Sequence, residues 1–182
     1  MEINWPTSFD NYFVCNGSDE KLYIYEEFSK KLSFQKIQEN FLLRVWEQKV
    51  KPFYKKRRIE PVGSLVMVID SLLENSRYYS GVLDVPISLE MLLKPDSLLV
   101  GVCDGGCYFK RRDVKKCWEA KELHPEVFYR DKTVCDDGHT TGRHISVKYV
   151  IYPFSQFIYI DNDLGKVLIG LSGDKHFRKI KE

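Results

Sequence analysis

The chain has 182 residues, of which 43% are apolar or aromatic, so it is long enough for one domain with a substantial buried core. Its 28 lysine and arginine residues nearly balance 26 aspartate and glutamate residues, and the net charge of +2 gives no overall field that would attract nucleic acid or an anionic membrane. The sequence shows neither a secretory signal nor an apolar run of membrane-spanning length, so we expect a cytoplasmic protein.

The five cysteines are odd in number and include no CxxC pair. This pattern favours reduced thiols over a disulfide framework. A zinc-dependent module built from the cysteines and His139 stays as an alternative, although the spacings match no standard zinc pattern.

The first part of the chain predicts a strand followed by a long helix. In residues 21–28, β-branched and aromatic side chains alternate with charges, and in residues 33–54 apolar side chains recur at helical spacing. We expect residues 1–60 to hold this strand and helix, residues 61–174 to form the functional core, and residues 175–182 to form a frayed basic tail, all within one domain.

The middle of the chain predicts a second helix and then a buried strand. Residues 64–79 carry a wide apolar face, which implies burial of this helix against a sheet. A connecting stretch with Pro86 and Pro95 follows, and residues 97–108 then begin with a near-continuous apolar run that is typical of a central strand.

The last part of the chain predicts one long polar loop and a closing hairpin. Residues 111–121 favour a short charged helix, residues 122–143 a glycine-containing loop and residues 145–152 a short apolar helix. Residues 156–160 and 166–171 predict two strands, because the Asp, Asn and Gly residues between them are typical of a hairpin turn.

A first polar cluster lies on the predicted second helix. Ser71 and Asn75 are four residues apart and therefore share a helix face. An asparagine amide in this position can ligate a hydrated Mg²⁺ that also holds phosphate oxygens. Alternatively, Asn75 caps the helix end, and Asp70 and Glu74 are surface charges.

A second polar cluster, Asp104-Gly105-Gly106, follows the predicted central strand. A carboxylate at a strand end can accept a hydrogen bond from a ligand amine, and the glycines would let backbone and ligand approach closely. An ordinary tight turn is the alternative.

A third polar cluster lies in the predicted loop, before the short helix. Backbone N–H groups near Gly138 and Gly142, with the hydroxyl of Thr141, suit an anionic phosphate. The alternative is a plain loop in which a threonine caps the helix.

In chain order, the three clusters resemble the nucleotide site of the GHKL ATPases, the superfamily of gyrase B, heat-shock chaperone ATPases, sensor histidine kinases and anti-sigma-factor serine kinases. The likeness covers roughly residues 64–172. Residues 72–76 are similar to the N-box, residues 99–106 to the strand entering the Asp-x-Gly box, residues 138–147 to the glycine lid, and residues 157–171 to the last two strands.

The resemblance implies an α/β (α+β) two-layer sandwich with helices on one face of a mixed β-sheet, and it implies ATP and Mg²⁺ as cofactors. It also assigns roles by position: the Mg²⁺-binding asparagine is Asn75, the aspartate for the adenine amino group is Asp104, its glycine partner is Gly106, and the phosphate-covering lid holds Gly138, Thr141 and Gly142.

One departure from the family pattern bears on catalysis. Ser71 stands where the ATPases and serine kinases of the family carry a general-base glutamate, and serine is a poor base at neutral pH. Tyr108 also replaces a glycine that the family carries two residues after Gly106. The resemblance therefore names no catalytic residue, and ATPase or kinase activity would need another base.

The expected function is that of an adenine-nucleotide-binding regulatory domain, nearest in size to the anti-sigma-factor kinases. The alternative is a degenerate pseudo-ATPase that serves as a protein-interaction module. We expect an adenine nucleotide and a regulatory protein as partners, leave a homodimer open, and expect neither membrane nor nucleic acid.

Overall fold

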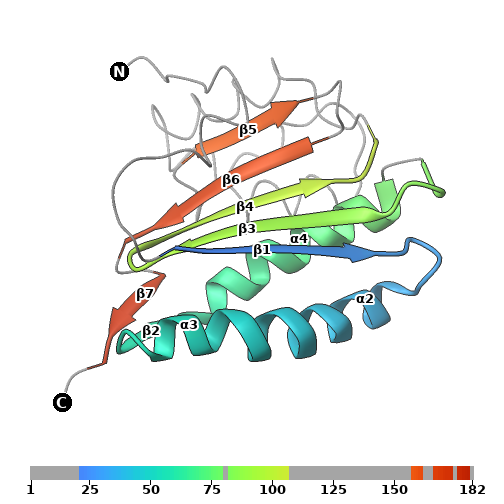
Figure 1. Ribbon diagram of the computed structural model, residues 1–182. Coiled ribbons are helices and arrows are strands. Elements are labelled where there is room, and N and C mark those ends of the chain that lie inside the picture. Colours follow the sequence, from blue (N-terminus) through green and yellow to red (C-terminus); the bar gives the residue numbers. More distant parts are fainter. Residues whose placement is uncertain (1–20, 80–81, 107–156, 162–165, 174–175, 181–182) are drawn as a thin grey trace, which may run out of the picture.

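A five-stranded sheet forms one layer of the fold, and the helices lie on one of its faces (Figure 1). The computed structural model describes residues 21–79, 82–106, 157–161, 166–173 and 176–180. In spatial order the strands are β1 (Leu22–Phe28), β3 (Ile87–Lys94), β4 (Ser97–Cys103), β6 (Lys166–Ser172) and β5 (Phe157–Asp161).

All four pairings in this sheet are antiparallel. The expectation of a mixed sheet is therefore wrong for the described strands. Together with the helices, these strands form an α+β fold. The chain connections explain two of these four pairings. Only Pro95 and Asp96 join β3 to β4, and only residues 162–165 join β5 to β6. Connections this short reverse the chain, whereas parallel neighbours need a crossover of a dozen or more residues.

The strand and long helix predicted at the start of the described chain are confirmed. The helix consists of α2 (Phe34–Asn40), η1 (Phe41–Val50) and α3 (Lys51–Lys55) in succession. Ser33 caps its start, because its hydroxyl accepts a hydrogen bond from the Lys36 N–H at 3.2 Å. Its apolar stripe is buried, including Ile37 and Phe41.

The middle section of this helix, η1, is a π-helix, and its widened turns lead into a proline. The N–H of Lys51 donates to the carbonyl of Trp46, five residues back. Pro52 follows directly. In an α-helix its ring would clash with the carbonyl four residues before it, and the wider turn relieves that clash.

The second predicted helix is also confirmed, as α4 (Gly63–Tyr79). It contacts β3 and β4 on the sheet and α2 beside it. Its wide apolar face is buried, as predicted, and comprises Leu65, Val68, Ile69, Leu72 and Leu73. The core therefore lies between the sheet and the helices.

The stretch with Pro86 and Pro95 is not the simple connection that the sequence suggested, because β3 lies between the two prolines. Its residues pair with β1 on one side and β4 on the other. Leu92 and Leu93 are consecutive and both buried, so neither face of the strand is polar throughout. This breaks the alternation that would have marked it as a strand.

The central strand predicted over residues 97–108 is confirmed in β4, which is the middle strand of the sheet but ends at Cys103. The expected hairpin is confirmed in β5 and β6. The helices and loop expected over residues 111–152 lie outside the described residues.

The expectation of a frayed tail is wrong for residues 177–179. They form β7 (Phe177–Lys179), which pairs with β2 (Ile59–Pro61) in a two-stranded ribbon (Figure 1). The ring of Phe177 packs 5.0 Å from that of the fully buried Tyr54, whose hydroxyl donates to the Ser97 carbonyl at 3.1 Å. Burial raises the pKa of Tyr54 far above its ordinary value, which keeps the hydroxyl a donor.

Candidate functional site

Three buried polar residues, Lys30, Asn75 and Asp104, mark one end of the fold. They belong to the segment after β1, the last turns of α4 and the segment after β4. These three element ends lie on the same side of the molecule, at the right in Figure 1. The structure thus brings the first and second predicted polar clusters to one end of the sheet.

Lys30 is the residue that ties these element ends together. Its side chain is 2% exposed, and its ammonium group donates to the carbonyl of Asp104 at 2.5 Å and to the carbonyl of Val82. Val82 follows α4 closely in the chain, so one side chain fastens the ends of β1, α4 and β4. Nearby, the Nε of Arg77 on α4 donates to the Leu32 carbonyl at 2.8 Å, a second link between these segments.

The ammonium group of Lys30 is withdrawn from water. Desolvation lowers the pKa of Lys30, and the carboxylate of Asp104 and the nearby Cys103 oppose this shift. An ammonium group removed from water needs both carbonyl acceptors and a nearby negative charge. The stability of the fold therefore depends in part on the contact between Lys30 and Asp104.

Asp104 is fully buried and shapes the turn after β4. One of its carboxylate oxygens accepts a hydrogen bond from the Gly106 N–H at 2.8 Å. Between them, Gly105 has a φ of 71°, a conformation that favours glycine. A Cβ at this position would also lie only 3.1 Å from the Val85 side chain. The cluster is therefore a tight turn that leaves a carboxylate inside the protein.

Asn75 is buried on α4, with 2% of its surface exposed. Within the described part of the chain, neither Oδ1 nor Nδ2 of its carboxamide has a hydrogen-bond partner. The side chain therefore does not cap the helix, and that alternative is wrong. An unpartnered buried amide costs about 1–3 kcal/mol, which makes Asn75 a candidate for contact with a ligand.

Asp70 is not a surface charge, because it lies half-buried between α4 and α2. Its Oδ2 accepts a hydrogen bond from Nε2 of Gln38 at 2.8 Å, whereas its Oδ1 is buried without a partner among the described residues. Desolvation raises the pKa of Asp70, the Gln38 hydrogen bond lowers it, and Glu74 raises it further. Because Asp70 faces α2, it does not share the face of α4 that carries Asn75.

We expect Asp70→Asn to raise the free energy of unfolding at pH 7 by about 1 kcal/mol, since it removes a poorly satisfied carboxylate. The wild-type pKa is raised above 3.8, so the native state binds more protons than the unfolded state in the window from 3.8 up to the folded pKa. Wild-type stability therefore falls as pH rises through that window, and the variant should lack this fall. Urea denaturation from pH 3.5 to 7 measures both, with the exposed Glu60→Gln as control.

The third predicted cluster, with Gly138, Thr141 and Gly142, lies outside the described residues, as does His139. Among the residues that the structure does describe, no three His, Cys, Asp or Glu side chains gather as a metal site. The carboxylate of Asp104 and the amide of Asn75 both place oxygen atoms at this end of the sheet. The Asn75 oxygen is a hard, uncharged ligand. It suits a hydrated Mg²⁺ that takes its other ligands from water and phosphate, and it does not suit a zinc site.

No model of a known protein family matches the chain. No curated protein is similar enough to match it either.

Proposed function

We propose that this protein is a regulatory domain of the cytoplasm that binds ATP or ADP with Mg²⁺ at the end of the sheet marked by Asn75 and Asp104. One observation carries the proposal: a buried carboxamide without a partner lies on the same end of the fold as a buried carboxylate. The resemblance to the GHKL nucleotide site supports it, because the same two positions have ligand-binding roles in that family. No helix in the described ranges is long and apolar enough to cross a membrane.

The chemistry of the two side chains suits the two ends of a nucleotide. The oxygen of Asn75 would ligate Mg²⁺, and its NH₂ group would donate to a phosphate oxygen, which satisfies both orphaned atoms. The carboxylate of Asp104 would accept a hydrogen bond from the adenine amino group. Lys30 would hold the backbone of Asp104 in place through its carbonyl.

Binding, rather than turnover, is the function that these residues favour. Hydrolysis or kinase chemistry needs a base that orients or activates the nucleophile. Ser71 is half-buried one turn before Asn75 and is a poor base, while Asp70 faces α2. The proposed role is therefore a nucleotide-dependent change in association with a regulatory partner protein.

A thermal-denaturation titration with ATP and MgCl₂ tests the proposal. A ligand at about 100 times its Kd should stabilise the native state by about 2.7 kcal/mol, and GTP should do so much less. Asp104→Asn keeps an oxygen that can accept from Gly106 but places an NH₂ donor where the adenine amino group needs an acceptor, so it should weaken ATP binding at least about tenfold. Wild-type protein that gains no stability from ATP with Mg²⁺, or a variant that gains as much, would remove the support for nucleotide binding.

A further inference from the structure

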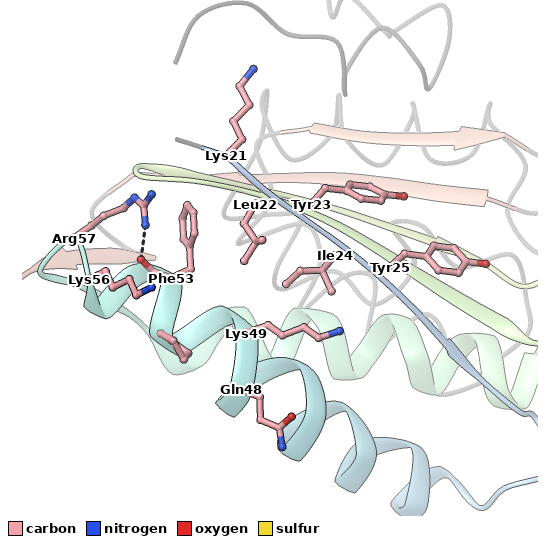
Figure 2. Close-up of a pocket in the computed structure, with 11 residues that line it drawn as sticks. Lys21, Leu22, Tyr23, Ile24, Tyr25, Gln48, Lys49, Phe53, Lys56 and Arg57 are labelled. Atoms are coloured by element: carbon pink, nitrogen blue, oxygen red, sulfur yellow. Dashed lines mark hydrogen bonds between the residues drawn. The ribbon is translucent and has the colours of Figure 1, made fainter. Parts of the chain in front are cut away.

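A groove lies beside the first residues of β1, away from Asn75. Its cavity measures about 690 Å³ and runs between β1 and the helix formed by η1 and α3 (Figure 2). Leu22 to Tyr25 form the strand wall, and Gln48, Lys49 and Phe53 belong to the helical wall. Because β1 is seven residues long, its start is about 20 Å from its end, and Lys30 lies beyond that end.

The strand wall belongs to an edge of the sheet. Among the described strands, β1 pairs only with β3, so alternate residues along its other side direct N–H and C=O groups away from the sheet. Leu22 and Ile24 turn toward the helix, whereas Tyr23 and Tyr25 project from the opposite face and are about half exposed (Figure 2). The edge therefore offers backbone hydrogen bonds beside an apolar floor.

The groove is lined by positive charge. Among the described residues that line it, none is acidic and four are cationic, namely Lys21, Lys49, Lys56 and Arg57. Lys49 pairs with Glu26 at 3.2 Å, but Glu26 also pairs with Arg44, so this group of three keeps a net positive charge. The guanidinium of Arg57 is fixed 3.9 Å from the centre of the Phe53 ring, and it donates to the Phe53 carbonyl at 2.8 Å.

We propose that the groove binds an acidic, extended segment of a partner protein, which adds to β1 as a further strand. Added strands gain main-chain hydrogen bonds from an exposed edge and specificity from pockets for alternate side chains. The four cations provide the charge complement for aspartate and glutamate on the segment. Glu26 and Glu27 would repel such a segment, so it pairs with the first half of β1, beside the groove.

This surface shares no residue with the proposed nucleotide site, and the two proposals can fail separately. Its test is selection of binders from a random dodecapeptide library displayed on phage, with the full-length protein as target. Enriched peptides should be rich in aspartate and glutamate and poor in proline, which cannot donate to a strand ladder. The best peptide, labelled with fluorescein, is then titrated by fluorescence anisotropy.

The variant that tests the groove is Lys56→Glu, and its matched control is Lys55→Glu. Both lysines are exposed neighbours at the end of the same helix, but only Lys56 lines the groove. Reversing a charge next to an acidic peptide should weaken binding about tenfold or more, and the control should change it by less than about threefold. Raising the salt concentration should weaken the binding of the wild type and diminish the difference.

The strand geometry has its own test in N-methylated peptides. An added strand uses the N–H groups of alternate residues only. Methylation of one alternate set should abolish binding, and methylation of the other set should be tolerated. Equal loss from both sets would show that the peptide does not bind as a strand.

Four other outcomes would overturn the proposal. In the selection, these are the enrichment of no peptide and the enrichment of basic peptides. In the titration, they are binding that Lys56→Glu does not weaken, and a dodecamer of uridylate that binds the groove more tightly than the peptide does. Sedimentation equilibrium adds a fifth: a dimer that Lys56→Glu dissociates would assign the groove to a second copy of the chain.

Discussion

Replacing Asn75 with leucine is expected to raise the free energy of unfolding of the ligand-free protein by about 1–3 kcal/mol. Leucine has nearly the same shape, and it removes two buried polar atoms that lack partners among the described residues. Most substitutions at a 2% exposed position destabilise a protein, so a gain here would be diagnostic. Urea denaturation without nucleotide measures the change, and Ser71→Ala on the same helix face serves as control.

The same leucine variant should lose the Mg²⁺-dependent part of nucleotide binding, because no oxygen remains to ligate the metal ion. Isothermal titration with ATP, with MgCl₂ and with EDTA, separates the two contributions. A variant that is more stable and no longer responds to Mg²⁺ would identify Asn75 as a functional residue kept at a cost in stability. A less stable variant would instead mean that the carboxamide stabilises the ligand-free fold, which contradicts this assignment.

Lys30→Met is expected to lower the free energy of unfolding by about 1–3 kcal/mol, because it removes a positive charge that lies near the buried Asp104 carboxylate. It also removes the donor from the carbonyls of Val82 and Asp104, both of which the lysine reaches. Methionine has a similar length, so the lost volume is small. Lys31→Met is the matched control, since Lys31 is exposed and should change stability by less than about 0.5 kcal/mol.

The pH dependence of the wild-type protein gives a second readout for Lys30. Burial lowers its folded pKa below the ordinary value of 10.5, so between these two values the unfolded state binds more protons than the native state. Stability should therefore rise with pH in that window, and Lys30→Met should lack this rise. Equal behaviour of the Lys30 and Lys31 variants would show that the buried ammonium does not link the element ends.

The main elements were predictable from the sequence where one face of an element is apolar and the other polar. The long helix over residues 33–54 and the helix α4 follow from such periodicity, and the hairpin of β5 and β6 follows from its turn residues. β3 was not predictable in this way, because consecutive apolar residues inside the sheet remove the alternation on which the prediction depends.

The candidate site was predictable only in part. Spacing places Asn75 on the buried face of its helix, but only the packed structure shows that its carboxamide has no partner among the described residues. Lys30 and Lys31 look equivalent in the sequence, and tertiary structure alone makes the first buried and the second exposed. The groove beside β1 likewise depends on how a distant helix packs against an edge strand, which no local pattern encodes.

The ribbon of β2 and β7 has a consequence for the order in which the chain acquires its structure. The ribbon joins residues 59–61 to residues 177–179, and the Val62 N–H also donates to the His176 carbonyl at 2.9 Å. During synthesis β2, which lies between the two helices, cannot pair until β7 is made, more than a hundred residues later in the chain. Contacts of such long sequence separation form slowly, because loop closure must precede them. The ribbon beside the helices therefore forms only after the ribosome has made residues 177–179.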